Sequence, residues 1–287
     1  MLRSLNRVFA MSYQFTAMSL IALAITNCSG GKMDTTNKVT FPTIKDVPAE
    51  AWQKLAQKKI YFGHQSVGYN IMDGVRDIMN KYPQAKLNVV ETLKPEDFKN
   101  PLFAHSPIGQ NFDLNAKSSD FMALMDKGVG NTVDVSFFKY CFVDITNETN
   151  VEKLFDEYKT RMSMVKDKYP KVIFVHMTVP LTTKQPGLKG FIKKIMGRPI
   201  GGYEDNINRH LFNERIRKEY AGKEPVFDLA AIEATYPDGS GAVFESNGKT
   251  YPRFVSEYTD DGGHLNELGR KKVAEQLLIL LANLANK

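Results

Sequence analysis

The hydrophobic positions along this chain follow two alternating patterns, one with the period of a helix and one made of short unbroken runs. Over residues 67–81, Ile71, Val75 and Ile78 recur at helical spacing and so share one face. The same spacing predicts further helices over residues 48–55, 151–169, 204–220 and from 266 to the end of the chain. The unbroken apolar runs predict strands over residues 59–62, 87–91, 133–145, 171–179 and 225–228.

This alternation of strands and helices predicts the fold class. Strands that are apolar along their whole length occur in parallel sheets that helices cover on both faces. We therefore expect an α/β fold, a three-layer α/β/α sandwich with a mostly parallel five-stranded sheet, as in flavodoxin-like folds. Asn247-Gly248 is a strong two-residue turn signal and predicts a hairpin over residues 244–255.

A basic segment, residues 185–202, follows the fourth predicted strand and is punctuated by Gly and Pro. It is either a solvated loop or a lid that overhangs the edge where the strand ends. Its lysines and arginine lie among Phe191, Ile192, Ile195 and Met196. This mixture would also suit contact with anionic lipid or an acidic glycan.

The N-terminal segment predicts export. Arg3 and Arg7 precede an apolar stretch over residues 15–25 that is too short to span a membrane comfortably. Cys28 follows it, with Ser and two Gly residues after the Cys, as in a bacterial lipobox. We expect a signal peptide over 1–28 with lipidation at Cys28, a flexible tether over 29–45, and one folded domain over 46–287. The alternative is a cleaved signal with an incidental Cys.

This prediction places the domain in the periplasm or at the cell surface as a membrane-anchored lipoprotein, whose membrane contact is the lipid. The net charge of +6 is mild and dispersed, which argues against nucleic acid as a partner. Cys141 is the one other cysteine, so no intrachain disulfide is expected, and it is interpreted as a small buried hydrophobe. The five histidines are scattered, so the sequence predicts neither a metal nor a cofactor.

Candidate chemistry begins at the C-terminal side, where Asp261-Gly262-Gly263-His264 precedes the last helix. A carboxylate three residues before an imidazole can fix its tautomer and stabilise its protonated form. At the other end of the chain, Ser66 follows the first predicted strand at the start of a helix, where N–H groups and the dipole favour an oxyanion. Alone, Ser66 could equally be an N-cap. With Asp261 and His264 it makes a candidate Ser-His-Asp triad.

The segments after other strands supply candidate donors for an oxyanion hole. Gly109 can bring its backbone N–H close to a substrate, or serve a turn alone. Asn111 and Asn147 carry amide donors, and Asn147 can instead cap the helix that follows it. His64 and Gln65, directly before Ser66, are candidate substrate contacts; His64 could equally satisfy a backbone group beside the strand end.

These blocks resemble the SGNH, or GDSL-type, hydrolase superfamily over roughly residues 57–284. Ser66 matches its serine block, Gly109 its glycine block, and Asp261-Gly262-Gly263-His264 its C-terminal Asp-x-x-His block, which is the most specific match. Two departures stand out. The family's Gly-Asp-Ser is His64-Gln65-Ser66 here, and Val143 falls where the third block carries an oxyanion Asn.

The resemblance implies a serine esterase in which His264 activates Ser66, Asp261 orients His264, and the N–H groups of Ser66 and Gly109 hold the oxyanion. A carbohydrate ester, with an acetyl group to be removed, is the substrate that family and location imply. Two alternatives remain at this point. One is a polysaccharide O-acetyltransferase of the same fold, and the other a non-catalytic glycan-binding or envelope scaffold protein.

Overall fold

The computed structural model describes residues 38–183 and 203–286. Its centre is a six-stranded sheet in the order β2-β3-β1-β4-β5-β6, and every neighbouring pair is parallel. This confirms the predicted α/β class, with six strands where the sequence predicted five. In chain order the strands are β1 (Lys59–His64), β2 (Val89–Glu91), β3 (Leu102–Pro107), β4 (Val135–Phe138), β5 (Ile173–Met177) and β6 (Val226–Phe227).

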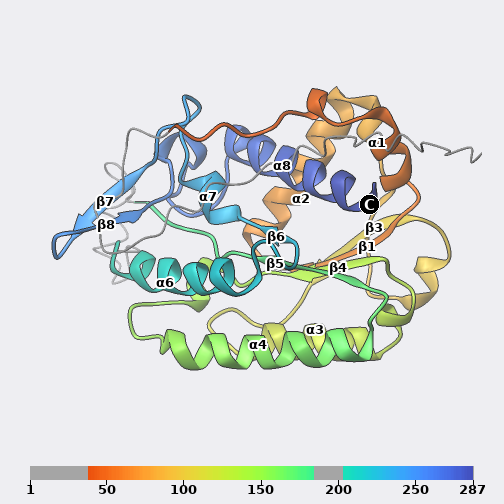
Figure 1. The fold of residues 1–287 in the computed structure, drawn as a ribbon, viewed down its shortest axis with the longest axis horizontal. Helices are drawn as coiled ribbons and strands as arrows, with labels where there is room; N and C mark the ends of the chain where they lie inside the picture. Colours follow the sequence, from red (N-terminus) through yellow and green to blue (C-terminus); the bar gives the residue numbers. More distant parts are fainter. Residues whose placement is uncertain (1–37, 184–202, 287) are drawn as a thin grey trace, which may run out of the picture. The chain divides into compact units, whose positions relative to one another are not determined.

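Helices cover both faces of this sheet (Figure 1). One face carries α1 (Ala49–Leu55), α2 (Val67–Lys81), α7 (Leu229–Glu233) and α8 (Glu267–Ala285). The other carries α3 (Ala116–Asp126), α4 (Val151–Lys168) and α6 (Tyr203–Tyr220). The predicted helices of 67–81, 151–169 and 204–220 thus appear within one residue of their expected ends.

The strands separate two hydrophobic cores because successive side chains point to opposite faces. In β1, Ile60 and Phe62 join the core under α1, α2 and α8, while Tyr61 between them joins the core above α3 and α4. All three are at most 1% exposed. Burying each such side chain stabilises the fold by roughly 1.5–3 kcal/mol.

The unpredicted strand is β3, which inserts between β1 and β2. Its apolar run is short, Leu102 to Ala104, and then continues into His105, Ser106 and a proline. Ser106 is nevertheless buried because its Oγ lies 2.7 Å from the hydroxyl oxygen of Tyr61. Tyr61, from a neighbouring strand, therefore allows a polar residue to be buried in β3, which the local hydrophobic pattern does not predict as a strand.

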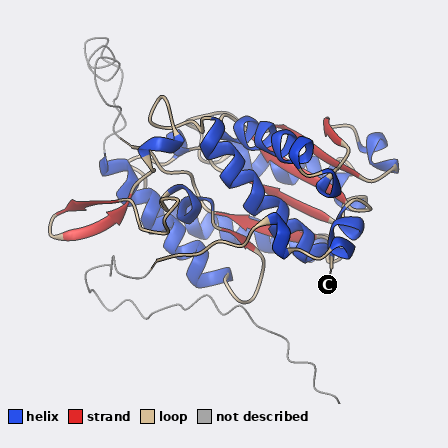
Figure 2. Ribbon diagram, turned by 90° about the horizontal axis from the view of Figure 1, so that it is seen from above, coloured by secondary structure: helices blue, strands red, loops and turns tan. Residues whose placement is uncertain are grey.

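The predicted hairpin is present as β7 (Val243–Ser246) and β8 (Lys249–Pro252), which pair antiparallel. At its turn Asn247 and Gly248 both have positive φ, 49° and 72°. These values match the turn that Asn-Gly favours between twisted strands. The hairpin projects beyond the helices in both views (Figures 1 and 2).

The packed domain begins slightly before residue 46, where the sequence placed the end of the tether. Ile44 is 1% exposed, and its backbone N–H donates to Glu275 Oε1 of α8 at 3.1 Å. The predicted signal peptide and the basic segment 185–202 lie outside the described residues. No helix in the described ranges is both long enough and apolar enough to cross a membrane.

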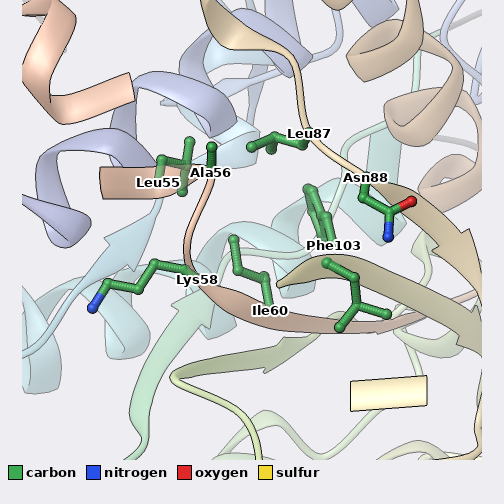
Figure 3. Close-up of a pocket in the computed structure, with 8 residues that line it drawn as sticks. Leu55, Ala56, Lys58, Ile60, Leu87, Asn88 and Phe103 are labelled. Atoms are coloured by element: carbon green, nitrogen blue, oxygen red, sulfur yellow. The ribbon is translucent and has the colours of Figure 1, made fainter. Parts of the chain in front are cut away.

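A small cavity of about 10 Å³ lies at the amino ends of β1 and β3 (Figure 3), a volume that suits about one water molecule. Its walls include Leu55, Ile60, Leu87 and Phe103. Open parallel sheets bind their ligands at the carboxyl ends of the strands. This cavity lies at the opposite, amino ends, so it is not expected to be a ligand site.

Candidate active site

Ser66 occupies a sharp turn between β1 and α2. Only Gln65 and Ser66 connect the two elements, and Ser66 has a φ of 53°, an unusual value for a residue with a Cβ. Its side chain makes no cap bond to the helix; its Oγ lies 2.5 Å from Nε2 of His264 instead. A strained strand-to-helix turn of this kind presents a serine hydroxyl outward. The N-cap interpretation of Ser66 is therefore wrong for its side chain.

His264 reaches Ser66 from the loop that connects η6 (Ser256–Tyr258) to α8. Its Nδ1 lies 2.6 Å from Oδ2 of Asp261. The other carboxylate oxygen accepts the backbone N–H groups of Gly263 at 2.9 Å and of His264 at 2.7 Å. The two carboxylate oxygens of Asp261 thus fix both the imidazole and the loop that carries it. The structure brings the three predicted triad residues into one hydrogen-bonded chain.

The charge of Asp261 sets the tautomer of His264. Partial burial acts to raise the pKa of Asp261, but hydrogen bonds from the His264 ring and from the two backbone N–H groups outweigh it and hold the pKa well below its usual range. The carboxylate is therefore ionised at neutral pH and accepts the proton on Nδ1. Nε2 is left as the acceptor that faces Ser66.

The ring of Phe142 supports the imidazole from the segment that follows β4. Phe142 belongs to η5 (Phe142–Asp144), and its ring meets that of His264 edge-on with centroids 5.5 Å apart. A Cβ on Gly263 would lie 2.8 Å from this ring, so only Gly fits there. Buried Arg209 of α6 donates from Nε to the Phe142 carbonyl at 2.9 Å and holds η5 in place.

His64 does not lie at the rim of the site as the sequence suggested. It is fully buried, and a Cβ on Gly68 would lie 2.3 Å from its ring, so it packs under the first turn of α2. Its Nε2 lies 3.0 Å from Nδ1 of His105, whose Nε2 lies 3.3 Å from the Arg76 guanidinium. Burial lowers the pKa of His64 to about 2, so it stays neutral and cannot act as a general base.

Gln65 uses its side chain to anchor the loop that follows β3. Its Nε2 donates to the carbonyls of Ile108, at 3.1 Å, and Gly109. The Gly109 N–H is directed elsewhere, because it donates to Asp120 Oδ2 at 2.9 Å. That bond occupies the N–H that the family resemblance assigned to the oxyanion hole.

Asn111 presents an amide in the same loop. Its Oδ1 accepts from the Lys117 ammonium at 3.0 Å. An ammonium only donates, so the oxygen must face Lys117 and the two Nδ2 protons must face away from it. The Lys117 side chain is fully buried and forms an ion pair with Asp144 at 2.7 Å. This pair fixes the orientation of the Asn111 amide.

Asn147 lies apart from this arrangement. It is exposed, and its backbone N–H donates to Asp205 Oδ1 at the start of α6 at 2.9 Å. No contact among the described residues joins it to Ser66, Asp261 or His264. Among those residues, no acceptor bonds the Ser66 N–H either, so within the described part of the chain this donor is unoccupied.

Sequence reasoning missed Lys117, which lies in the unpredicted helix α3. A lysine followed by Ser118, Ser119 and Asp120 gives no local signal of burial. His64 did carry a signal. It shares a strand face with the buried Ile60 and Phe62, since alternate residues of a strand point the same way.

In the described ranges, no group of three or more His, Cys, Asp or Glu side chains is arranged to hold a metal ion.

No protein-family model matches this sequence, and no curated protein sequence matches it. Among solved structures, a GDSL-like lipase from Bacteroides thetaiotaomicron is 13% identical, with a TM-score of 0.46, over 83% of this chain and 95% of that one. An acetyl xylan esterase is 13% identical with a TM-score of 0.41, over 76% of this chain and 97% of that one.

A third structure is the periplasmic domain of a lipopolysaccharide acetyltransferase from Salmonella ser. Paratyphi A, 10% identical with a TM-score of 0.45, over 77% of this chain and 82% of that one. All three TM-scores lie below 0.5, so these likenesses assign no chemistry to the chain. The chain is thus similar to a GDSL-like lipase, an acetyl xylan esterase and an acetyltransferase domain.

Proposed function

We propose that this protein is a serine esterase that removes an acyl group from an ester through Ser66, His264 and Asp261. One observation carries the proposal, the unbroken chain from Ser66 Oγ to His264 Nε2 at 2.5 Å and from His264 Nδ1 to Asp261 Oδ2 at 2.6 Å. A hydroxyl, an imidazole and a carboxylate in this order are the parts that nucleophilic catalysis at an acyl carbon requires.

In the first half of the reaction Ser66 Oγ attacks the ester carbonyl carbon while its proton moves to Nε2 of His264. The carbonyl oxygen becomes an oxyanion in a tetrahedral intermediate. When the carbon–oxygen bond to the alcohol breaks, His264 gives its proton to the leaving alkoxide. Asp261 stabilises the imidazolium between these two steps. The products are a free alcohol and an acyl group on Ser66.

In the second half, water replaces the alcohol. His264 accepts a proton from water as it attacks the acyl carbon, then returns that proton to Ser66 Oγ as the acid leaves. The side chains of His264 and Asp261 are 43% and 46% exposed, so water reaches this face of the site freely.

Two donors are assigned to the oxyanion. The free N–H of Ser66 lies at the start of α2, where the helix dipole favours negative charge. The Nδ2 group of Asn111, directed away from Lys117, is the second. Asn111 thus replaces the asparagine that the resemblance places where Val143 stands.

An acetyl group on a carbohydrate is the substrate class we assign to this site, and a polysaccharide O-acetyltransferase is the runner-up. The exposed triad and the ordered His264 ring speak against a scaffold without catalysis, because a binding protein has no need for a carboxylate that orients an imidazole.

Purified protein should hydrolyse 4-nitrophenyl acetate, and Ser66→Ala should abolish that hydrolysis. Gln65→Ala tests a neighbour that only anchors a loop and should retain part of the activity. Full activity in Ser66→Ala would remove Ser66 from the mechanism. Adding an acceptor oligosaccharide separates esterase from transferase, since a transferase yields acetylated oligosaccharide in place of free acetate.

We further propose that the domain is exported and anchored by a lipid on Cys28. The arginine-flanked apolar stretch before Cys28 supports this assignment. Metabolic labelling of cells with a palmitate analogue should tag the wild-type chain, and Cys28→Ala should lose the tag. A wild-type chain that is exported but carries no label would contradict the anchor.

A further inference from the structure

One aromatic side chain stands in solvent on the loop that Gln65, the residue before Ser66, anchors. Phe112 is 77% exposed, the highest value among the large hydrophobic residues of the described part of the chain. It lies in the loop after β3, the strand that pairs directly with β1. That loop contains Gly109, whose carbonyl Gln65 holds, and Asn111, assigned above to the oxyanion.

The backbone of Phe112 is held in an unfavourable conformation. Its φ is 67°, a region that costs an L-residue with a side chain roughly 1 kcal/mol or more. The N–H of Phe112 donates to Asp144 Oδ1 at 3.1 Å, and that carboxylate is buried in the ion pair with Lys117. A fully buried ion pair therefore fixes the position of a strained residue.

The folded chain gains nothing from this ring. An exposed phenyl group neither packs in the core nor hydrogen-bonds, and a polar residue or Gly would suit a positive φ better. Strain of this kind persists where function requires it. The backbone of Phe112 is tied to Asp144 of η5, the segment whose Phe142 ring lies against His264. Because that backbone is already fixed, ordering the ring against a ligand costs less conformational entropy.

The surroundings of Phe112 select one class of ligand. Gln110 and Asp113 beside it are polar and exposed, and no partner among the described residues binds the Gln110 side chain. A long acyl chain would need a continuous apolar channel, whereas a single ring among polar groups suits a sugar. The C–H face of a pyranose packs on an aromatic ring while its hydroxyls bond to amides.

We propose that Phe112 is the platform for the sugar ring that carries the ester, so that it sets the enzyme's preference for glycan esters over simple ones. This inference rests on the proposed esterase function and names its specificity residue. Phe112 takes no part in the proton transfers.

The test compares acetylated xylo-oligosaccharide with 4-nitrophenyl acetate, which has no sugar. Phe112→Ala should lower the ratio of the two kcat/KM values about five- to tenfold, mainly through a higher KM for the oligosaccharide. Phe112→Trp should restore the ratio. Met164→Ala removes another exposed hydrophobic side chain, on α4, and serves as the matched control that leaves the ratio unmoved. Phe112→Gly relieves the strained φ, so it should fold while losing the preference.

Binding separates this inference from the esterase proposal. Calorimetry on Ser66→Ala measures the Kd of the oligosaccharide without turnover, and adding Phe112→Ala should weaken it about five- to tenfold. If Phe112→Ala weakens binding but the wild-type protein hydrolyses neither ester, the platform stands and the esterase proposal falls. An unchanged ratio together with an unchanged Kd would overturn the platform, and so would failure of Ser66→Ala to bind the oligosaccharide.

Discussion

Lys117 donates from its ammonium to Oδ1 of Asn111 at 3.0 Å, and this single bond decides which way the Asn111 amide faces. The Lys117 side chain has no exposure, and Asp144 neutralises it at 2.7 Å. An uncompensated charge at such a depth would be costly, so the ammonium, its carboxylate and the amide form one unit. The unit directs the two Nδ2 protons of Asn111 away from the Lys117 ammonium.

Asn111→Ala should lower kcat for acetyl ester hydrolysis by about a hundredfold or more, with little change in KM, because the lost donor acts on the oxyanion. Steady-state kinetics on 4-nitrophenyl acetate measure this. Asn147→Ala is the comparison, since the sequence named both residues, but Asn111 lies in the loop that Gln65 anchors whereas Asn147 contacts Asp205. A larger loss of kcat in Asn147→Ala than in Asn111→Ala would show that the oxyanion donor has been misassigned.

Asp261→Asn should fold normally and lose about 10⁴-fold in kcat. The amide can donate to Nδ1 and so favours the wrong tautomer, with the proton on Nε2. Asp260→Asn is a control at the adjacent carboxylate, which contacts the side chain of Asn266 and not His264. Equal losses in the two variants would remove Asp261 from its orienting role.

Gly68→Ala should destabilise the domain by about 1–3 kcal/mol, because the new methyl group would lie 2.3 Å from the buried His64 ring. Urea denaturation measures the free energy of unfolding. Both the Cβ and the ring of His64 lie within 2.4 Å of the new methyl group, so only the double variant with His64→Gly gives it space, and there the two effects should be far from additive. At Gly241 a Cβ would meet nothing nearer than 3.9 Å, so Gly241→Ala should cost less. Additive effects in the double variant would mean that Gly68 and His64 are not in contact.

Glu233 should make stability depend on pH. Burial raises the pKa of this carboxyl from 4.5 to about 8, and the Leu181 N–H and the charges of Lys139 and Arg209 counter this only in part. Between those two pH values the folded state keeps a proton that the unfolded state has released. The contribution of Glu233 to stability is therefore complete below pH 4.5 and falls as the pH rises to about 8, by at most about 1.4 kcal/mol per unit.

Glu233→Gln removes the titrating group and should flatten this decline. Urea denaturation at pH 5 and pH 8 gives the free energy of unfolding of each protein. Between these two pH values the wild type should lose more stability than the variant. Parallel changes in the two proteins would show that Glu233 does not retain its proton on folding.

The sequence predicted those parts of the fold that depend on local pattern. The helix over 67–81 appears with its predicted ends because its apolar residues repeat at helical spacing. Asp261 and His264 were found together because one loop holds both. Ser66 was recognised from its place after a strand, although 198 positions separate it from His264.

The remainder depends on contacts between distant segments. β3 lacks a long apolar run, and Tyr61 supplies the partner that lets Ser106 be buried. The Gly109 N–H was assigned to a ligand, yet Asp120 accepts it. From the sequence Lys117 would be placed on the surface, but it is buried because Asp144, from another segment, compensates its charge. Burial of a polar group depends on its partner, and the sequence around the group does not name that partner.

The most direct test of the central claim is covalent labelling of the purified domain with a fluorophosphonate, followed by mapping of the modified residue. A serine that an imidazole activates reacts with such a probe, whereas an ordinary N-cap serine does not. The structure predicts labelling at Ser66 that disappears in His264→Ala. Folded wild-type protein that remains unlabelled, or label that persists at Ser66 without His264, would contradict the assignment of Ser66 as an activated nucleophile.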